Sequence, residues 1–146
     1  MPSQKKPAAL TAPRFRKQVR PNLQLGNYDN ERPVWRVSTL DIGGPWCWKC
    51  IDGITIWAEI YDKISHFEKM TWLEIKQHGS HSIKIDELCP EARKRLEQIQ
   101  LDDVEELFSL RLTGKQRIWG IRHNAILKIL WWDPGHEVCP SEKKHT

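Results

Sequence analysis

The chain has 146 residues, 39% of them hydrophobic and 29% charged, with a formal net charge of +4. This length and balance suit one small globular domain with an additional tail. The sequence has no apolar run of about 18 residues and no secretory signal near its start, so neither a membrane span nor export is expected. We therefore expect a cytoplasmic protein with reduced cysteines.

Positive charge is concentrated near the start of the chain. Residues 1–36 hold eight cations and two anions, whereas the remainder holds 15 cations and 17 anions. Prolines recur in the same segment, which argues against regular structure there. We predict a basic, proline-rich flexible tail over 1–33 and a single domain over 34–146. The tail would either bind an acidic partner, most simply nucleic acid, or only aid solubility.

The first predicted elements are a strand and a helix separated by a turn. "PVWRVSTL" suits a first strand, and Gly43-Gly44-Pro45 then breaks any regular element. "ITIWAEIYDKISHFEKM" carries apolar residues at three- and four-residue spacing, which predicts an amphipathic helix. The stripe expected to face the core consists of Trp57, Ile60, Tyr61, Ile64 and Phe67.

A short extended segment and a second helix should follow. "HSIKIDEL" alternates and is expected to be extended, and "CPEARKRLEQIQ" has proline at a plausible first helical position. Ala92, Leu96 and Ile99 would lie on one side of that helix.

The last part of the domain is predicted to form two consecutive hairpins. "LFSLRLTGKQRIWGIRHNAILKILWW" has turns at Gly114-Lys115 and near His123-Asn124. A two-residue first loop would pair Leu112 with Arg117, Leu110 with Trp119 and Phe108 with Ile121, making one face apolar. The opposite face, where chemistry or binding is expected, would carry Ser109, Arg111, Thr113, Gln116, Gly120 and Arg122. The last strand is apolar on both sides, which suggests a central strand.

The order of a strand, helices and an antiparallel meander ending in "ILKILWW…H" resembles the RelE/ParE superfamily of small bacterial toxins, best over roughly 104–146. The resemblance implies an α+β fold with an N-terminal strand and two or more helices packed on a C-terminal antiparallel meander. Its ribonuclease branch cleaves messenger RNA, usually on the ribosome, and its ParE branch inhibits DNA gyrase. Many members are neutralised by an antitoxin protein.

The family pattern also implies a set of site residues. Arg111, Arg122 and His136 would be catalytic. The same pattern places Arg117 on the first hairpin, where it would bind RNA. From the residue types alone, RNA binding would also involve Lys115, Trp132, Lys143, Lys144 and His145. Attack by a 2′-hydroxyl needs a proton acceptor, a proton donor and cations for the phosphate charge, so neither a metal nor another cofactor is required.

Structural roles are the alternative for each of these residues. Arginines on a sheet face are often solvated or paired with carboxylates, and Arg117 would lie among apolar neighbours, which favours a structural ion pair. His136 follows the turn "DPG" and could simply be an exposed polar residue. Most of the eight tryptophans should be core anchors, although Trp46, Trp48 and Trp132 could be exposed to stack on bases or bind an antitoxin.

Two further hypotheses come from other classes of protein. "CWKC" and "HEVC" place Cys47, Cys50, His136 and Cys139 at intervals that a tetrahedral zinc site could use to support a binding protein. A non-catalytic inhibitor or accessory interaction module, acting through exposed aromatic residues, is the other alternative, and the sequence barely disfavours it.

Overall fold

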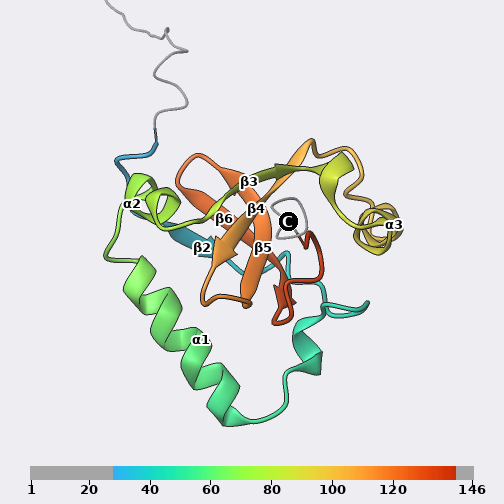
Figure 1. Cartoon of the computed structure of the whole chain (residues 1–146), viewed down its shortest axis with the longest axis horizontal. Helices are drawn as coiled ribbons and strands as arrows, with labels where there is room; N and C mark the ends of the chain where they lie inside the picture. The colour runs from blue at the N-terminus through green and yellow to red at the C-terminus, as the bar shows by residue number, and fades with distance from the viewer. Residues whose placement is uncertain (1–27, 141–146) are drawn as a thin grey trace, which may run out of the picture.

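The computed structural model describes residues 28–140, which form three α-helices and one five-stranded sheet (Figure 1). The helices are α1 (Ile54–Phe67), α2 (Trp72–Gln77) and α3 (Pro90–Gln98). The strands are β2 (Val34–Arg36), β3 (His81–Lys84), β4 (Glu106–Arg111), β5 (Arg117–His123) and β6 (Ile126–Asp133). The predicted α+β class is therefore confirmed.

The sheet has the strand order β2-β6-β5-β4-β3. β4, β5 and β6 form the predicted antiparallel meander, and β3 extends it, but β2 pairs in parallel with β6. The sheet is therefore mixed rather than antiparallel throughout. β6 lies between β2 and β5, as expected for a strand that is apolar on both sides.

Both faces of the sheet are covered, with α1 and α2 on one side and α3 on the other (Figure 1). The first core packs α1 and α2 against Phe108, Leu110, Leu112, Ile118, Leu127, Ile129 and Trp132. The second packs α3 and the chain after β6 against Ile83, Leu107, Trp119, Leu130 and Trp131. The prediction of one apolar face and one open face is therefore wrong.

The first hairpin also differs from the prediction by one residue. Arg111 pairs with Arg117 and Leu110 with Ile118, and the Leu112 amide donates to the Gln116 carbonyl at 2.9 Å, so the loop holds three residues instead of two. The Thr113 hydroxyl accepts from the amides of Lys115 and Gln116, which fixes this longer turn.

A bulge explains why the register of β6 could not be read from its sequence. Trp119 pairs with Trp131 but Gly120 pairs with Ile129, so Leu130 is the extra residue. Leu130 and Trp131 consequently both belong to the second core. A Cβ at position 120 would lie 2.5 Å from the Lys128 carbonyl oxygen, so the strands approach closely only because this residue is glycine.

The amphipathic helix α1 forms as predicted, but its apolar stripe is wider than the core it covers. Ile60 and Phe67 are buried, whereas Trp57 is 40% and Tyr61 70% exposed. The prediction that the whole stripe faces the core is therefore wrong. α3 begins at Pro90, and its Ala92 is fully buried as expected.

The folded region begins before Val34. The Trp72 and Leu73 amides at the start of α2 donate to the carbonyls of Glu31 and Asp29, so these residues pack on the domain. The predicted boundary between tail and domain at residue 33 is thus too late, and the rest of that segment, 1–27, lies outside the described residues. Within residues 28–140, no helix has the length and apolar character needed to cross a bilayer.

Candidate nucleic-acid interface

The turn between β4 and β5 forms one end of the sheet and carries three of the predicted cations. Arg111 ends β4 and is exposed, and its amide donates to the Ser80 hydroxyl at 2.9 Å. Lys115 lies at the tip of the turn and is also exposed. These two side chains are available to a phosphate backbone, for which exposed cations provide the main attraction.

Arg117, opposite Arg111, is only 8% exposed. Its Nη1 donates to the carbonyls of Thr113, Gly114 and Gln116 at 2.8, 3.3 and 3.1 Å, so the guanidinium closes the turn from inside. The structure therefore gives Arg117 a role in holding the loop on which Lys115 is carried.

The chain after β6 returns to the same end of the sheet, because Asp133 pairs with Arg117. The fully buried Asp133 carboxylate accepts from the Trp119 indole at 3.1 Å and from the Glu137 and Val138 amides at 2.9–3.0 Å. These bonds fix a tight turn in which His136 adopts a φ of 60° and is half-buried. His136 is thus held near the Arg117 end of β5.

Arg122 lies elsewhere. It is five residues further along β5 than Arg117, about 17 Å at strand spacing, and its side chain is on the opposite face. Its guanidinium donates to Asp29 at 3.1 Å and stacks over the Trp72 ring at 4.5 Å. Hydrogen bonds from Lys76 and Arg122 outweigh the effect of burial and lower the pKa of Asp29. The structure therefore does not gather Arg111, Arg122 and His136 into one site.

Trp132 is 6% exposed and packs against Trp48 at a centroid distance of 6.0 Å in the first core. Trp46 and Trp48 are also buried, so the expectation that these three rings are exposed for stacking is wrong. Lys143, Lys144 and His145 lie outside the described residues.

The four proposed zinc ligands are not assembled. Within residues 28–140, no three His, Cys, Asp or Glu side chains come close enough to share one metal ion. Cys47 and Cys50 are adjacent, with their Sγ atoms 2.8 Å apart, whereas the Cys139 thiol donates to the Glu87 carbonyl. The shared zinc site is therefore contradicted.

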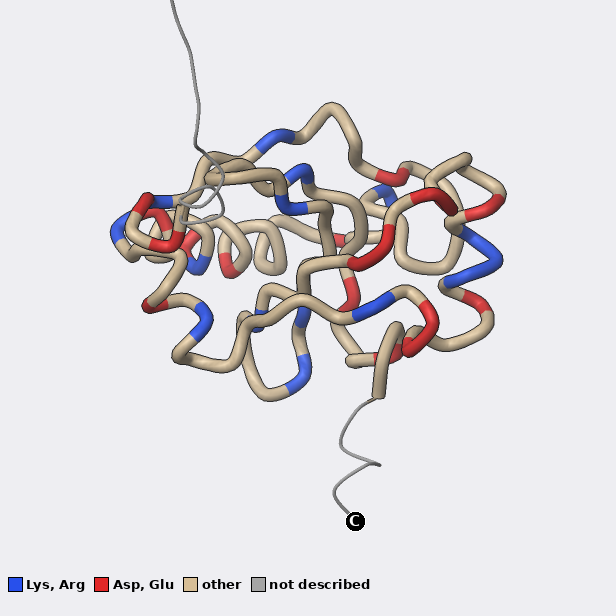
Figure 2. Tube along the Cα trace, turned by 90° about the horizontal axis from the view of Figure 1, so that it is seen from above, with Lys and Arg blue, Asp and Glu red and all other residues tan. Residues whose placement is uncertain are grey.

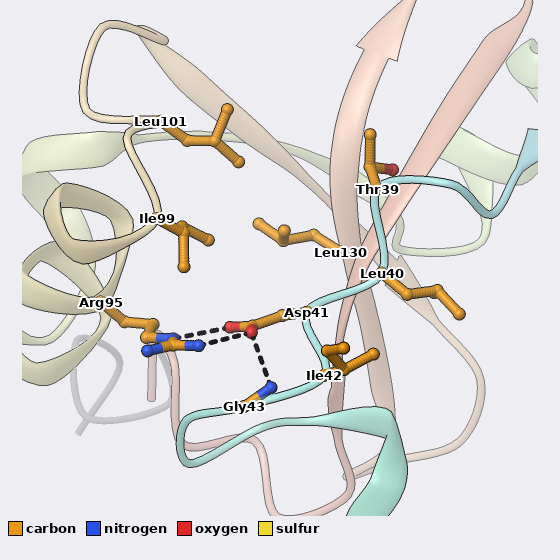
Figure 3. A pocket seen from close by; sticks show the side chains of 9 residues that line it. All are labelled: Thr39, Leu40, Asp41, Ile42, Gly43, Arg95, Ile99, Leu101 and Leu130. Carbon is orange, nitrogen blue, oxygen red and sulfur yellow. Dashed lines mark hydrogen bonds and ion pairs between the residues drawn. The ribbon is translucent and has the colours of Figure 1, made fainter.

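A hollow of about 370 Å³ lies between α3 and the segment after β2 (Figure 3). Its polar centre is the buried Asp41 carboxylate, which accepts from Arg95 at 2.7 and 2.9 Å, from the Trp131 indole at 2.8 Å and from the Gly43 amide at 3.0 Å. Burial would raise the pKa of Asp41, but these hydrogen bonds outweigh it and lower the pKa. The carboxylate is already satisfied by protein donors, so the network is structural.

His81 was not among the predicted site residues. It is exposed on β3 and pairs with Ser109 of β4. Because Ser109 and Arg111 are two residues apart on β4, His81 lies on the same face of the sheet as Arg111. Its position depends on the pairing of β3 with β4, which residue spacing alone does not reveal. The sequence does contain a signal, since "HSIKIDEL" alternates as an edge strand would.

Basic and acidic residues are interspersed along the trace of the described chain (Figure 2). Residues 1–27 contain six cations and no anion, so the positive surplus of the whole chain lies outside the described domain. No family model matches the chain, and neither the curated proteins nor the solved structures include a significant match.

Proposed function

We propose that this protein is a toxin-like endoribonuclease that cleaves messenger RNA, on the ribosome, without a metal ion. The observation that carries the proposal is that exposed Arg111 and Lys115 lie at the same end of the β4-β5-β6 meander as the turn that holds His136. This end combines phosphate-binding cations with an imidazole, the side chain most often used for proton transfer in catalysis. A cognate antitoxin protein would neutralise the activity, in keeping with the family resemblance.

The chemistry assigned to this end requires a proton acceptor, a proton donor and a cation. His136 would accept the proton of a ribose 2′-hydroxyl as it attacks the adjacent phosphate, and water would protonate the departing 5′-oxygen. Arg111 would stabilise the extra negative charge that develops on that phosphate. Arg117 acts indirectly, since its bonds to the turn carbonyls hold Lys115 in place. Arg122 is left out because Asp29 and Trp72 already engage it at the other end of β5.

The test is to map new RNA 5′ ends shortly after induced expression in a bacterial host. New ends within translated codons are expected with the natural chain, and Arg111→Ala and His136→Ala should each remove them. Arg36→Ala is the matched control, because Arg36 is an exposed cation on β2. Loss of the new ends in the Arg36 variant, or their persistence in both site variants, would contradict the assignment.

A non-catalytic interaction module is the second candidate, favoured by the apolar surface of α1. Ile54 is 81%, Tyr61 70% and Trp57 40% exposed, and their three- and four-residue spacing places them on one side of the helix. A contiguous exposed apolar patch is often an interaction site. Growth arrest without new RNA ends would support this candidate. In that case Tyr61→Ser should relieve the arrest, whereas Arg111→Ala should leave it unchanged.

A further inference from the structure

The Cys-x-x-Cys segment has a local geometry that neither the ribonuclease nor the interaction proposal uses. Cys47 and Cys50 bracket a short 3-10 turn, and the Cys50 amide donates to the Cys47 carbonyl at 3.2 Å. Both thiols are free, and their sulfur atoms are 2.8 Å apart. In a turn of this kind the Cα atoms of the first and fourth residues lie within about 7 Å, and a disulfide requires roughly 4.4–6.8 Å.

We propose that Cys47 and Cys50 form a reversible intramolecular disulfide by exchange with a low-molecular-weight disulfide such as oxidised glutathione. The small disulfide oxidises the two thiols and is itself reduced. This proposal does not depend on the proposed nuclease activity.

The two thiols differ in accessibility, which sets the order of the reaction. Cys50 is exposed, whereas Cys47 is only 6% exposed. The Cys50 thiolate attacks one sulfur of oxidised glutathione, forms a mixed disulfide and releases one glutathione thiolate. The Cys47 thiolate then attacks the Cys50 sulfur, closes the internal disulfide and releases the second glutathione. Two protein thiols are thus oxidised while one glutathione disulfide is reduced to two thiols.

The environment of Cys50 suits a slow, reversible exchange rather than rapid turnover. Its hydrogen bond with Cys47 raises the pKa of the Cys50 thiol, so little thiolate is present at neutral pH. The neighbour that limits its attack is also the group that resolves the mixed disulfide. The other two cysteines are less suited to this role, since Cys89 is half-buried and Cys139 is 3% exposed and donates to Glu87.

The position of the pair gives its oxidation a structural consequence. Trp46 and Trp48 flank Cys47 and enter the second and first cores, where they pack on Trp131 and Trp132 at 5.3 and 6.0 Å. The Trp48 indole also donates to the Leu130 carbonyl at 3.0 Å. A disulfide across this turn would restrict the unfolded chain next to Trp46 and Trp48, which anchor this segment in both cores.

The test uses the full chain, purified reduced and equilibrated in buffers of increasing oxidised-to-reduced glutathione ratio. Samples are acid-quenched, alkylated and analysed by intact mass and peptide mapping. We expect loss of two alkylatable thiols per chain, a disulfide confined to the peptide containing residues 47–50, and full recovery with dithiothreitol. Cys89→Ser should behave as the natural chain, and Cys50→Ser, whose fold is checked by circular dichroism, should not form this disulfide.

Cys47→Ser provides a second and more specific readout, because it removes the resolving thiol. This variant should accumulate one glutathione on Cys50 that the natural chain does not retain. The proposal is overturned if the natural chain keeps all its thiols alkylatable at the most oxidising ratio, if it stops at a stable glutathione adduct, or if the disulfide involves Cys89 or Cys139.

Discussion

The Asp41 network offers the sharpest test of what holds the domain together. Its carboxylate accepts from Arg95 of α3 and from the Gly43 amide in the segment after β2 (Figure 3). It also accepts from the Trp131 indole of β6, so it joins three parts of the fold. Asp41→Ala removes all these acceptors at once. The substitution should therefore destabilise the packing of α3 on the sheet rather than a single surface contact.

The expected loss in the free energy of unfolding depends on how exposed Arg95 and Trp131 are. Removing one member of a buried ion pair costs about 3–5 kcal/mol, chiefly because the other charge is left buried. The Asp41 side chain is 3% exposed, but that of Arg95 is 20% exposed and can regain some water. The Trp131 indole, which is fully buried, would lose its acceptor. We therefore expect a loss of about 3 kcal/mol in the free energy of unfolding.

Urea unfolding of Asp41→Ala, Arg95→Ala and the double variant measures this directly. The two changes should be strongly non-additive, because each removes the same pair of hydrogen bonds. An Asp41→Ala cost below about 1 kcal/mol, or additive effects within about 0.5 kcal/mol, would refute the reasoning.

The remaining predictions concern backbone packing, a helix cap and acid stability. Gly120→Ala should cost on the order of 1–3 kcal/mol in urea unfolding, since its Cβ would meet the opposing carbonyl at 2.5 Å, whereas Gly114→Ala, with nothing within 4 Å, should be nearly neutral. Thr71→Ala removes the capping box with Glu74 and should cost about 0.5–2 kcal/mol in the same assay. Because the pKa of Asp41 is lowered in the folded state, its ionised carboxylate stabilises the fold fully above the ordinary pKa of 3.8, and this stabilisation is lost as the pH falls through the folded pKa. In Asp41→Asn, the free energy of unfolding measured by urea titration should therefore depend less on pH over that range.

Local patterns in the sequence predict the elements of this domain better than their pairing. α3 could be anticipated because Pro90 suits the first helical position and Ala92 and Leu96 share a face. α2 was not among the predicted helices, although its start has a local signal, the Thr71-x-x-Glu74 capping box. Such signals depend on residues a few positions apart, so tertiary contacts are not needed to interpret them.

The hairpin register could not be predicted in the same way. A slip of one residue exchanges the faces of a strand, and it is strongly penalised only when one face is apolar and the other solvated. Here Leu110 enters the first core and Leu107 the second, so both registers bury apolar side chains. The choice is made by the Thr113 turn and by Arg117, which satisfies the turn carbonyls. The sequence favoured a structural role for Arg117 because apolar neighbours were expected around it, and its 8% exposure agrees with that prediction.

Because both faces of the sheet are covered, a nucleic acid could bind only at its ends and edges. This distinguishes Arg111 from Arg122, which the sequence had assigned to the same site. With both faces occupied, contact is restricted to the ends and edges of the sheet, where Arg111 is exposed. The side chain of Arg122 is 17% exposed and is engaged by Asp29 and the Trp72 ring. Their substitutions should therefore affect different properties.

We expect Arg122→Ala to lower the free energy of unfolding by about 1–2 kcal/mol, from one partly exposed ion pair and one cation–π contact. Arg111→Ala should change stability by less than about 0.5 kcal/mol. For binding to a single-stranded RNA oligomer, measured by fluorescence anisotropy over a range of salt, Arg111→Ala should weaken affinity and reduce the salt slope by roughly 1, while Arg122→Ala retains both. Equal binding losses in the two variants would mean that RNA does not distinguish the two ends of β5, and the hairpin end could not then be the interface.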